Sequence, residues 1–400
     1  MRKRIIGIVI LALLLAIDFI LGLVSKHYIS ELPDQNAAKR WGTDGRYAQV
    51  SLFYTEDQMV TYESIRKLEY NLEKKMHDAG IIVDDDNDKD NGIVETVPVG
   101  GKKDEETSVE SAVQEDIKEY VSCYSAQGIS TILFENKKAE NIDTIGVGGD
   151  FFLFHPLEIV TGGYFGPDDL MKDRIVVDED FAWQLFGSND IIGQCVTIDG
   201  VNHYIVGVVK RAEGRFNKAA GLSKSTVYMS YDSLSKYGTV LSGRVKEEEI
   251  SEDGAKVQNG GINCYEVVMP DPVEGIALRL VRESSGLEEK YIAAVDNTNR
   301  FSSFSLASVV MDFGIRSMWT QPIYYPYWEN VARGWEDVLG VILLIRMICR
   351  VAFWCIIAII IVKAYRSKTW TVGGVVRYLA DKKYDFEAKR QMDRNNKTKY

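Results

Sequence analysis

The sequence predicts an α+β fold between two membrane-spanning helices, and three observations support this expectation. An apolar segment lies near each end of the chain, at residues 5–24 and 338–362. A strand followed by a helix occurs early in the central block and again late in it, with a β-hairpin between them. Because about 20 apolar residues suffice to cross a bilayer, the two segments exclude a simple cytosolic protein. The first segment is longer than the apolar core of a cleaved signal peptide, so we expect it to remain as an anchor.

The two apolar segments divide the charged residues unevenly. Residues 1–4 carry three basic side chains, and residues 363–400 carry 11 Lys and Arg against 4 Asp and Glu. The central block, residues 25–337, holds 31 basic and 53 acidic residues, a net charge of −22. Lys and Arg are enriched on the cytoplasmic flanks of membrane helices, so both termini, including the basic tail, are predicted to be cytoplasmic. The acidic block is then extracytoplasmic on a cell membrane, and its charge argues against a nucleic-acid partner.

The central block opens with a strand–helix unit. Residues 47–54 (YAQVSLFY) show the alternation of a strand. Residues 55–57 (TED) offer capping oxygens for a helix over residues 58–79, which Gly80 ends.

An acidic loop at residues 84–92 (DDDNDKDNG) follows this helix. Its alternating Asp residues resemble a calcium loop, but Asn91 stands where the sharp turn needs Gly and Val97 where the bidentate Glu belongs. We therefore expect a solvated surface loop, with ion binding left open.

The middle of the block is predicted to be mostly β. After a helix at residues 108–121, strands are expected at residues 129–134, 143–147 and 174–177. Asp178 caps a helix that ends at Gly187.

A hairpin and a second strand–helix unit complete the block. The pair Asp199-Gly200, between two β-branched runs, is a strong hairpin signal. Residues 263–269 (NCYEVVM) form a late strand, after which Asp271 as the cap and Pro272 at the first helical position open a helix that continues to Val281.

An ordered series of motifs in residues 149–211 resembles a known family. The series runs from DFF through GGYF, RIVV, FAWQLFG, IIGQ and VTIDG to YIVGVV. It is similar to the MacB-like periplasmic core domain, the external domain of ABC-transporter permeases of the MacB/FtsX type. The resemblance implies a porter-like subdomain, made of the two strand–helix units, interrupted by a mostly β subdomain at about residues 122–215. The motif residues taken as structural are Phe151, Gly162, Phe186, Gly187, Gly193, Asp199, Gly200 and Gly207.

Catalytic, cofactor and metal motifs are not found in the sequence. It contains no phosphate-binding loop, no His-Glu-x-x-His and no Gly-x-Ser-x-Gly. The histidines are widely spaced, and Cys123, Cys195 and Cys264 are expected to be buried free thiols because three cysteines make no disulfide framework. We therefore expect no enzymatic activity, no catalytic residue, no cofactor and no metal site. The aromatic run at residues 319–328 is expected to lie among the lipid headgroups.

Charged residues interrupt both apolar segments. Asp18 and Arg346 lie at similar depths from the outer ends of their helices, and charges within membrane helices tend to pair. We expect an Asp18–Arg346 pair joining the helices, with Arg350 facing a partner. The alternative is a second span that begins near Leu343, from which Arg346 reaches the interface.

The combined features predict a non-catalytic, permease-like membrane component of an ABC-type transporter or mechanotransmission complex. The resemblance implies a separate ABC ATPase subunit and a second permease or homodimer partner, besides the lipid bilayer. The resembled permeases usually have three membrane helices after the external domain, whereas one apolar run follows it here, so an accessory, degenerate or split permease is expected. The alternative is a membrane-anchored cell-surface binding or sensing module with no transport role.

Overall fold

The computed structural model describes residues 2–42, 46–81, 120–243, 260–316, 323–367 and 372–397. The chain forms two compact units. The larger comprises Ser25–Leu343, and the smaller comprises Met1–Val24 together with Leu344–Tyr400.

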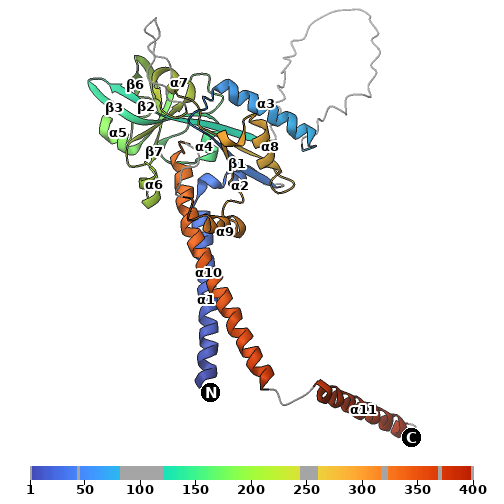
Figure 1. Ribbon diagram of the computed structural model, residues 1–400. Helices are drawn as coiled ribbons and strands as arrows, with labels where there is room; N and C mark the ends of the chain where they lie inside the picture. Colours follow the sequence, from blue (N-terminus) through green and yellow to red (C-terminus); the bar gives the residue numbers. More distant parts are fainter. Residues whose placement is uncertain are drawn as a thin grey trace, which may run out of the picture. The chain divides into compact units, whose positions relative to one another are not determined.

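A sheet of 11 strands organises the described part of the larger unit (Figure 1). Its main path runs β11–β1–β10–β2–β3–β8–β5–β7–β4, while β6 pairs with β2 and β7, and β9 pairs with β2. The sheet and the helices packed on it confirm the predicted α+β fold. The strands are β1 (Tyr47–Tyr54), β2 (Val121–Phe134), β3 (Lys137–Gly149), β4 (Glu158–Gly162), β5 (Arg174–Asp178), β6 (Cys195–Ile198), β7 (Val201–Lys210), β8 (Thr226–Ser230), β9 (Thr239–Val240), β10 (Cys264–Pro270) and β11 (Ile292–Asp296).

Short helices connect the strands of the larger unit. Their bounds are η1 (Pro33–Gln35), α2 (Ala37–Trp41), α3 (Tyr62–Asp78), α4 (Phe151–Phe154), α5 (Glu179–Phe186), α6 (Arg215–Ala219), α7 (Tyr231–Tyr237), α8 (Ile276–Ser284), η3 (Glu289–Tyr291) and α9 (Ser303–Met311).

The two predicted strand–helix units are neighbours in the structure. Strands β1 and β10 pair antiparallel, with Ser51 opposite Glu266. The helices that follow them, α3 and α8, contact each other through a 2.9 Å ion pair between Lys75 Nζ and Glu283 Oε2. Both helices bury apolar side chains in the main hydrophobic core. Two segments far apart in the sequence thus build one half of the sheet.

Helix α3 begins later than predicted. Its N-cap is Thr61, whose hydroxyl accepts a 3.4 Å hydrogen bond from the backbone N–H of Ser64. The predicted cap at residues 55–57 is wrong, because the hydroxyl of Thr55 donates to the carboxylate of Asp57 instead.

Helix α8 also begins later than predicted, at Ile276 instead of Pro272. Gly275, in the left-handed region with φ 86°, precedes it. Asp271 nevertheless serves the helix N-terminus, because its Oδ1 accepts from the backbone N–H of Ala277 at 3.1 Å.

The local predictions in the middle of the chain are confirmed. The strands expected at residues 129–134 and 143–147 are parts of the longer β2 and β3. Asp178 caps α5 by accepting a 2.7 Å bond from the N–H of Phe181. Strands β6 and β7 form the predicted hairpin, and its turn residues Asp199 and Gly200 have φ of 48° and 80°.

Two sequence predictions lie outside the described residues. One is the acidic loop at residues 84–92. The other is the helix at residues 108–121, of which Tyr120 and Val121 are described, and Val121 already begins β2.

The expected headgroup position of the aromatic run is wrong for its last residue. Trp328 is 2% exposed and lies in a core cluster with Phe151, inside the larger unit. Packing against other aromatic rings removes more apolar surface from water than a position at the lipid headgroups would. Trp319 lies outside the described residues.

Three long helices contribute to the smaller unit. They are α1 (Arg2–Ser30), α10 (Tyr327–Arg366) and α11 (Val372–Lys397). By length and composition, α1 and α10 could each cross a membrane. Both continue unbroken into the larger unit, α1 up to Ser30 and α10 from Tyr327.

Gly162 and Gly163 offer a matched test of the family motif. Gly162 has φ +78°, and a Cβ there would lie 2.2 Å from the carbonyl oxygen of Val206, whereas nothing lies within 4 Å of a Cβ at Gly163. We expect Gly162→Ala to lower the free energy of unfolding by about 1–3 kcal/mol, the usual cost of a forced overlap. Gly163→Ala should leave it nearly unchanged. Thermal unfolding of the detergent-solubilised chain measures both, and equal midpoints for the two variants would contradict the prediction.

Candidate functional site

A continuous chain of polar side chains, all buried except the partly exposed Asp34, crosses the sheet in the larger unit. It begins in η1, directly after α1, and ends on the first turns of α10. It therefore links the segment that follows one long helix to the segment that starts the other. We call it the buried polar network, defined by Asp34, His155, Glu266, Ser51, Asn297, Arg300, Glu329 and Glu336.

The first part of the network is centred on His155, which follows α4. Its Nδ1 lies 2.9 Å from Oδ1 of Asp34, and its Nε2 contacts Oε2 of Glu266 on β10. The imidazole is fully buried. The rings of Phe151 and Trp328 cover it, with centroids 4.6 and 4.2 Å from its own. His155 thus joins the segment after α1 to a central strand.

The surroundings of His155 favour its charged form. Burial alone would lower the pKa of the imidazole, but Glu266 and Asp34 outweigh it through charge attraction and hydrogen bonds and raise the pKa from 6.5 to about 9. At neutral pH both ring nitrogens therefore carry protons, and each donates to a carboxylate.

The middle part of the network passes across three neighbouring strands. Oε1 of Glu266 accepts a 2.5 Å bond from the hydroxyl of Ser51 on β1. That hydroxyl in turn accepts a 2.6 Å bond from Nδ2 of Asn297, directly after β11. Oδ1 of Asn297 accepts a 3.1 Å bond from Nη1 of Arg300. Each donor and acceptor here is paired, as burial requires.

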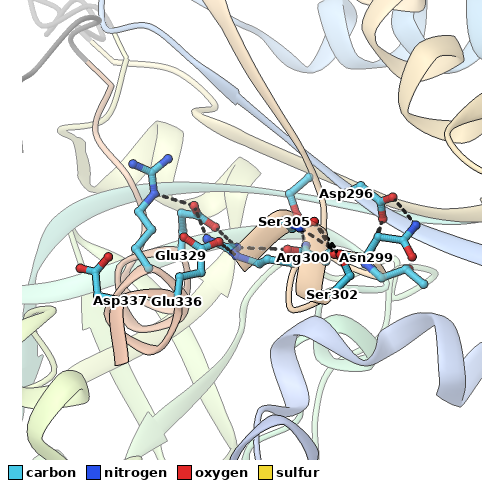
Figure 2. Close-up of polar contacts among 12 residues, drawn as sticks. Asp296, Asn299, Arg300, Ser302, Ser305, Glu329, Glu336 and Asp337 are labelled. Carbon is cyan, nitrogen blue, oxygen red and sulfur yellow. Dashed lines mark hydrogen bonds and ion pairs between the residues drawn. The ribbon is translucent and has the colours of Figure 1, made fainter. Parts of the chain in front are cut away.

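The last part of the network holds the start of α10 (Figure 2). Arg300 lies in the loop between β11 and α9 and is 5% exposed. Its two terminal nitrogens donate to the two carboxylate oxygens of Glu329 at 2.6 and 2.9 Å. Its Nε donates to Glu336 at 2.5 Å. Burial lowers the pKa of Arg300, but the charges of Glu329 and Glu336 outweigh it, so that the pKa is raised and the guanidinium stays charged.

Two further arginines complete the ionic balance. Nε of Arg333 lies 2.7 Å from Oε1 of Glu329, and Arg316 contacts the free oxygen of Glu336. Glu329 and Glu336 therefore each contact two arginines. Such pairing is what makes buried charges tolerable, because an unpaired buried ion costs several kcal/mol.

Two residues of the network, together with the neighbouring Cys123, resemble a metal site in their composition. Donor atoms of Cys123, His155 and Glu266 lie within 4.8 Å of one another. However, both nitrogens of His155 already contact carboxylates. Burial, followed by the charge of Glu266, raises the pKa of the Cys123 thiol well above its usual 9, which disfavours the thiolate that metals bind. These contacts favour a structural role for His155 and Glu266, as members of the buried polar network, over metal binding.

The charged residues singled out within the two apolar segments come together in the smaller unit. Oδ1 of Asp18 lies 3.0 Å from Nε of Arg346. Arg350, which was expected to face a partner, instead has its Nε 3.2 Å from both oxygens of Asp18. Residues four apart share a helix face, so both arginines reach the same carboxylate. Gly22 lies one turn from Asp18 and leaves room for the guanidinium, since a Cβ there would lie 3.0 Å from Arg346.

The family-motif residues support the fold and, with one exception, lie away from the network. Gly207 lets β7 approach Gly163, whose oxygen would lie 2.1 Å from a Cβ. Phe186 packs on Phe134 with centroids 4.3 Å apart. The exception is Phe151, whose ring covers His155. The turn residues among them, all with positive φ, are Gly162, Gly187, Gly193, Asp199 and Gly200.

The polar network itself was missed by sequence reasoning. Its contacts join residues 111 positions apart at His155–Glu266 and 121 apart at His155–Asp34. One signal was available, because Glu329 and Glu336 are seven residues apart and share a face of α10, just before the apolar run. Two carboxylates on one helix face, next to an apolar run, indicate that cationic side chains pack against that face.

Two helices that are long and apolar enough to cross a membrane thus flank, in sequence, a mixed α/β core domain. Residues 73–258 match the family described as MacB-like periplasmic core domain. This match confirms the resemblance seen in the motifs of residues 149–211.

Two similar proteins are named as macrolide export proteins. The macrolide export ATP-binding/permease protein MacB of Agrobacterium fabrum is 26% identical over 186 residues, 45% of this chain and 26% of that protein. The MacB of Chromobacterium violaceum is 31% identical over 78 residues, 19% of this chain and 12% of that protein. The chain therefore spans about a quarter or less of the length of these relatives.

Two solved structures are similar to this chain at low sequence identity and low TM-score. The periplasmic region of MacB from Actinobacillus actinomycetemcomitans shares 13% identity, with 64% of this chain and 92% of that one covered and a TM-score of 0.35. The extracellular domain of the noncanonic ABC-type transporter YknZ from Gram-positive bacteria shares 16% identity, with 62% and 100% covered and a TM-score of 0.34.

Removing Arg300 should strongly destabilise the buried polar network. Arg300→Ala leaves Glu329 and Glu336 buried without their main cation, so we expect the free energy of unfolding to fall by about 3–5 kcal/mol. Arg282→Ala is the control, since its pair with Glu289 is exposed at 41% and 79% and should contribute less than about 1 kcal/mol. Chemical unfolding measures both, and similar losses would contradict a special role for Arg300.

The charge on His155 predicts a loss of stability at alkaline pH. The folded pKa of about 9 lies above the ordinary 6.5, so the stabilisation is complete below pH 6.5 and is lost as pH rises through 9. Its size is up to about 3 kcal/mol. His155→Gln, which cannot be charged, should lack this component. Unfolding midpoints measured from pH 6 to 10 test it, and parallel pH profiles for both proteins would contradict it.

A charge exchange tests the intramembrane cluster. Asp18→Arg or Arg346→Asp alone leaves like charges facing each other in an apolar segment, so we expect each variant to lose the association of the two helices. The double variant restores opposite charges and should recover it. Cross-linking between cysteines placed in the two helices reports the association, and normal cross-linking in both single variants would show that the cluster is dispensable.

Proposed function

We propose that the chain is a non-catalytic, permease-like component of an ABC-type export or mechanotransmission complex in the cell membrane. Both termini lie in the cytoplasm, and the MacB-like core domain lies outside. A separate ATPase subunit supplies the energy, and a second permease or a second copy of the chain completes the membrane part.

The observation that carries this proposal is the buried polar network. Transmission of motion requires that the helices entering the membrane be rigidly joined to the external domain. After α1, Asp34 contacts the core domain through His155. On α10, Glu329 and Glu336 contact it through Arg300. Helix α1 is unbroken up to Ser30 and α10 is unbroken from Tyr327. We propose that a shift of either helix is passed to the sheet through these contacts.

The match to the MacB-like core domain supports the same role. Two relatives are named ATP-binding/permease proteins, in which both activities reside in one protein. These 400 residues contain no phosphate-binding loop, and we assign ATP hydrolysis to a separate subunit.

Purification of the full chain from its own membranes in mild detergent tests the proposal. We expect a stable complex with an ATPase subunit, and its isolation without any ATPase would contradict the transporter role. Probes on α3 and α8 should report a nucleotide-dependent change in the core domain of that complex. Arg300→Ala should weaken this change while the ATPase stays bound, and Arg282→Ala should not.

A second candidate, a cell-surface binding or sensing module, is favoured by a cleft in the larger unit. The cleft has a volume of about 880 Å³. Its wall combines exposed aromatic rings, Trp41 and Tyr62, with the carboxylates of Asp168 and Asp232. Rings and carboxylates suit a cationic, partly apolar ligand. Retention of such a ligand by a chain that purifies without an ATPase would support this role in place of the first.

A further inference from the structure

Helix α9 lies beside the point on α10 where the apolar run begins. Leu306 of α9 packs with Leu339 of α10 in one apolar cluster. After α9, Nε of Arg316 lies 3.1 Å from Oδ1 of Asp337, and Asp337 immediately precedes the apolar run. The segment from α9 to Arg316 is therefore level with the outer end of that run.

The same segment exposes large apolar side chains. Phe304 is 84% exposed, Met311 76% and Ile315 63%. Leu306, on the opposite side of the helix, is buried at 5%. A monomeric soluble domain rarely clusters such side chains in water, and contiguous exposed apolar surface indicates an interaction site.

A second element at the same level is basic. Helix α6 contacts α10 through Phe216, whose ring centroid lies 5.1 Å from that of Trp335. Arg215, Lys218 and Lys224 on and after α6 are exposed and form no ion pair within the described part of the chain. The central block that contains them has a net charge of −22, so this local basic cluster is unusual.

Aromatic residues mark the level of both elements. Tyr28, near the end of α1, packs on Trp335 with ring centroids 4.5 Å apart. Trp and Tyr are the residues enriched at the boundary between lipid tails and water. Trp335 stands three residues before the apolar run on α10, and Tyr28 stands four residues after the apolar run on α1, where that boundary would lie.

We propose that α9 and α6 form a membrane-facing base of the core domain. Phe304, Met311 and Ile315 lie among the headgroups and upper acyl chains of the outer leaflet. The basic side chains of α6 bind the phosphates of anionic phospholipids, since each Lys or Arg near such a surface adds to the attraction. The inference rests on the proposed membrane anchoring. It adds that the external domain itself binds the bilayer surface.

Spin labels in proteoliposomes of the full chain test the apolar part. In a background with Cys195, Cys349 and Cys355 replaced by alanine, a nitroxide is attached at Phe304→Cys or Ile315→Cys. Oxygen concentrates in lipid and a water-soluble nickel complex in water, so their relative access reports depth. Tyr70→Cys is the aqueous control, because Tyr70 is 67% exposed on α3, which Figure 1 places on the opposite side of the sheet from α9. Leu15→Cys, in the apolar part of α1, is the control for lipid.

We expect labels at 304 and 315 to favour oxygen, as at 15, and the label at 70 to favour nickel. If the labels at residues 304 and 315 favour the nickel complex, as the label at residue 70 does, while the label at residue 15 favours oxygen, the inference is overturned and membrane anchoring remains. A label at 15 in water would overturn the anchoring as well.

The basic part is tested with a label at Ala219→Cys on α6. We expect access of the nickel complex to fall when phosphatidylglycerol is added to phosphatidylcholine vesicles, and to recover in high salt, which screens surface charge. The double variant Arg215→Glu/Lys218→Glu should remove the effect of phosphatidylglycerol. No change with lipid composition in the parent protein would overturn the assignment of α6 as a binder of anionic lipid.

Discussion

The burial of Arg300 against Glu329 and Glu336 is the constraint on which the lower part of the core domain depends. A guanidinium taken out of water must find carboxylates in a fixed geometry, and α10 supplies both from one face. This requirement sets the rotation and height of the first turns of α10 beside the sheet. It also determines which residues of α10 lie next to α9, because Leu339 follows Glu336 by three residues.

The pairing continues through neutral side chains to a second buried cation. Asn297 and Ser51 carry hydrogen bonds from Arg300 to Glu266, and Glu266 holds the charged His155. A buried ionic network of this kind contributes little net stability compared with apolar packing, but it tolerates few alternative arrangements. Its main effect is therefore on geometry. It allows one relation between the segment after α1 and the start of α10.

Local features of the chain were predictable because their causes are local. The Asp178 cap, the stop at Gly187 and the Asp199–Gly200 turn depend on neighbours a few residues away. The start of α3 was not, because Thr55 and Thr61 are both competent caps. The choice between them followed from the tertiary position of Thr55, whose backbone N–H donates to the carbonyl of Tyr291 in the distant η3 and whose hydroxyl donates to Asp57.

By itself, the sequence determined the two apolar helices, the partition of charge among the residues before, between and after them, the α+β core and its resemblance to the MacB-like periplasmic core domain. These follow from composition, periodicity and motif order, which the chain carries regardless of how it folds. The tertiary structure decided that Trp328 covers His155 within the core and that Arg350 shares Asp18 with Arg346. It also decided that carboxylates and cations more than 100 residues apart meet in one network. Such pairings arise only when strands are placed side by side, because the energy of a buried ion depends on every group around it and not on its sequence neighbours.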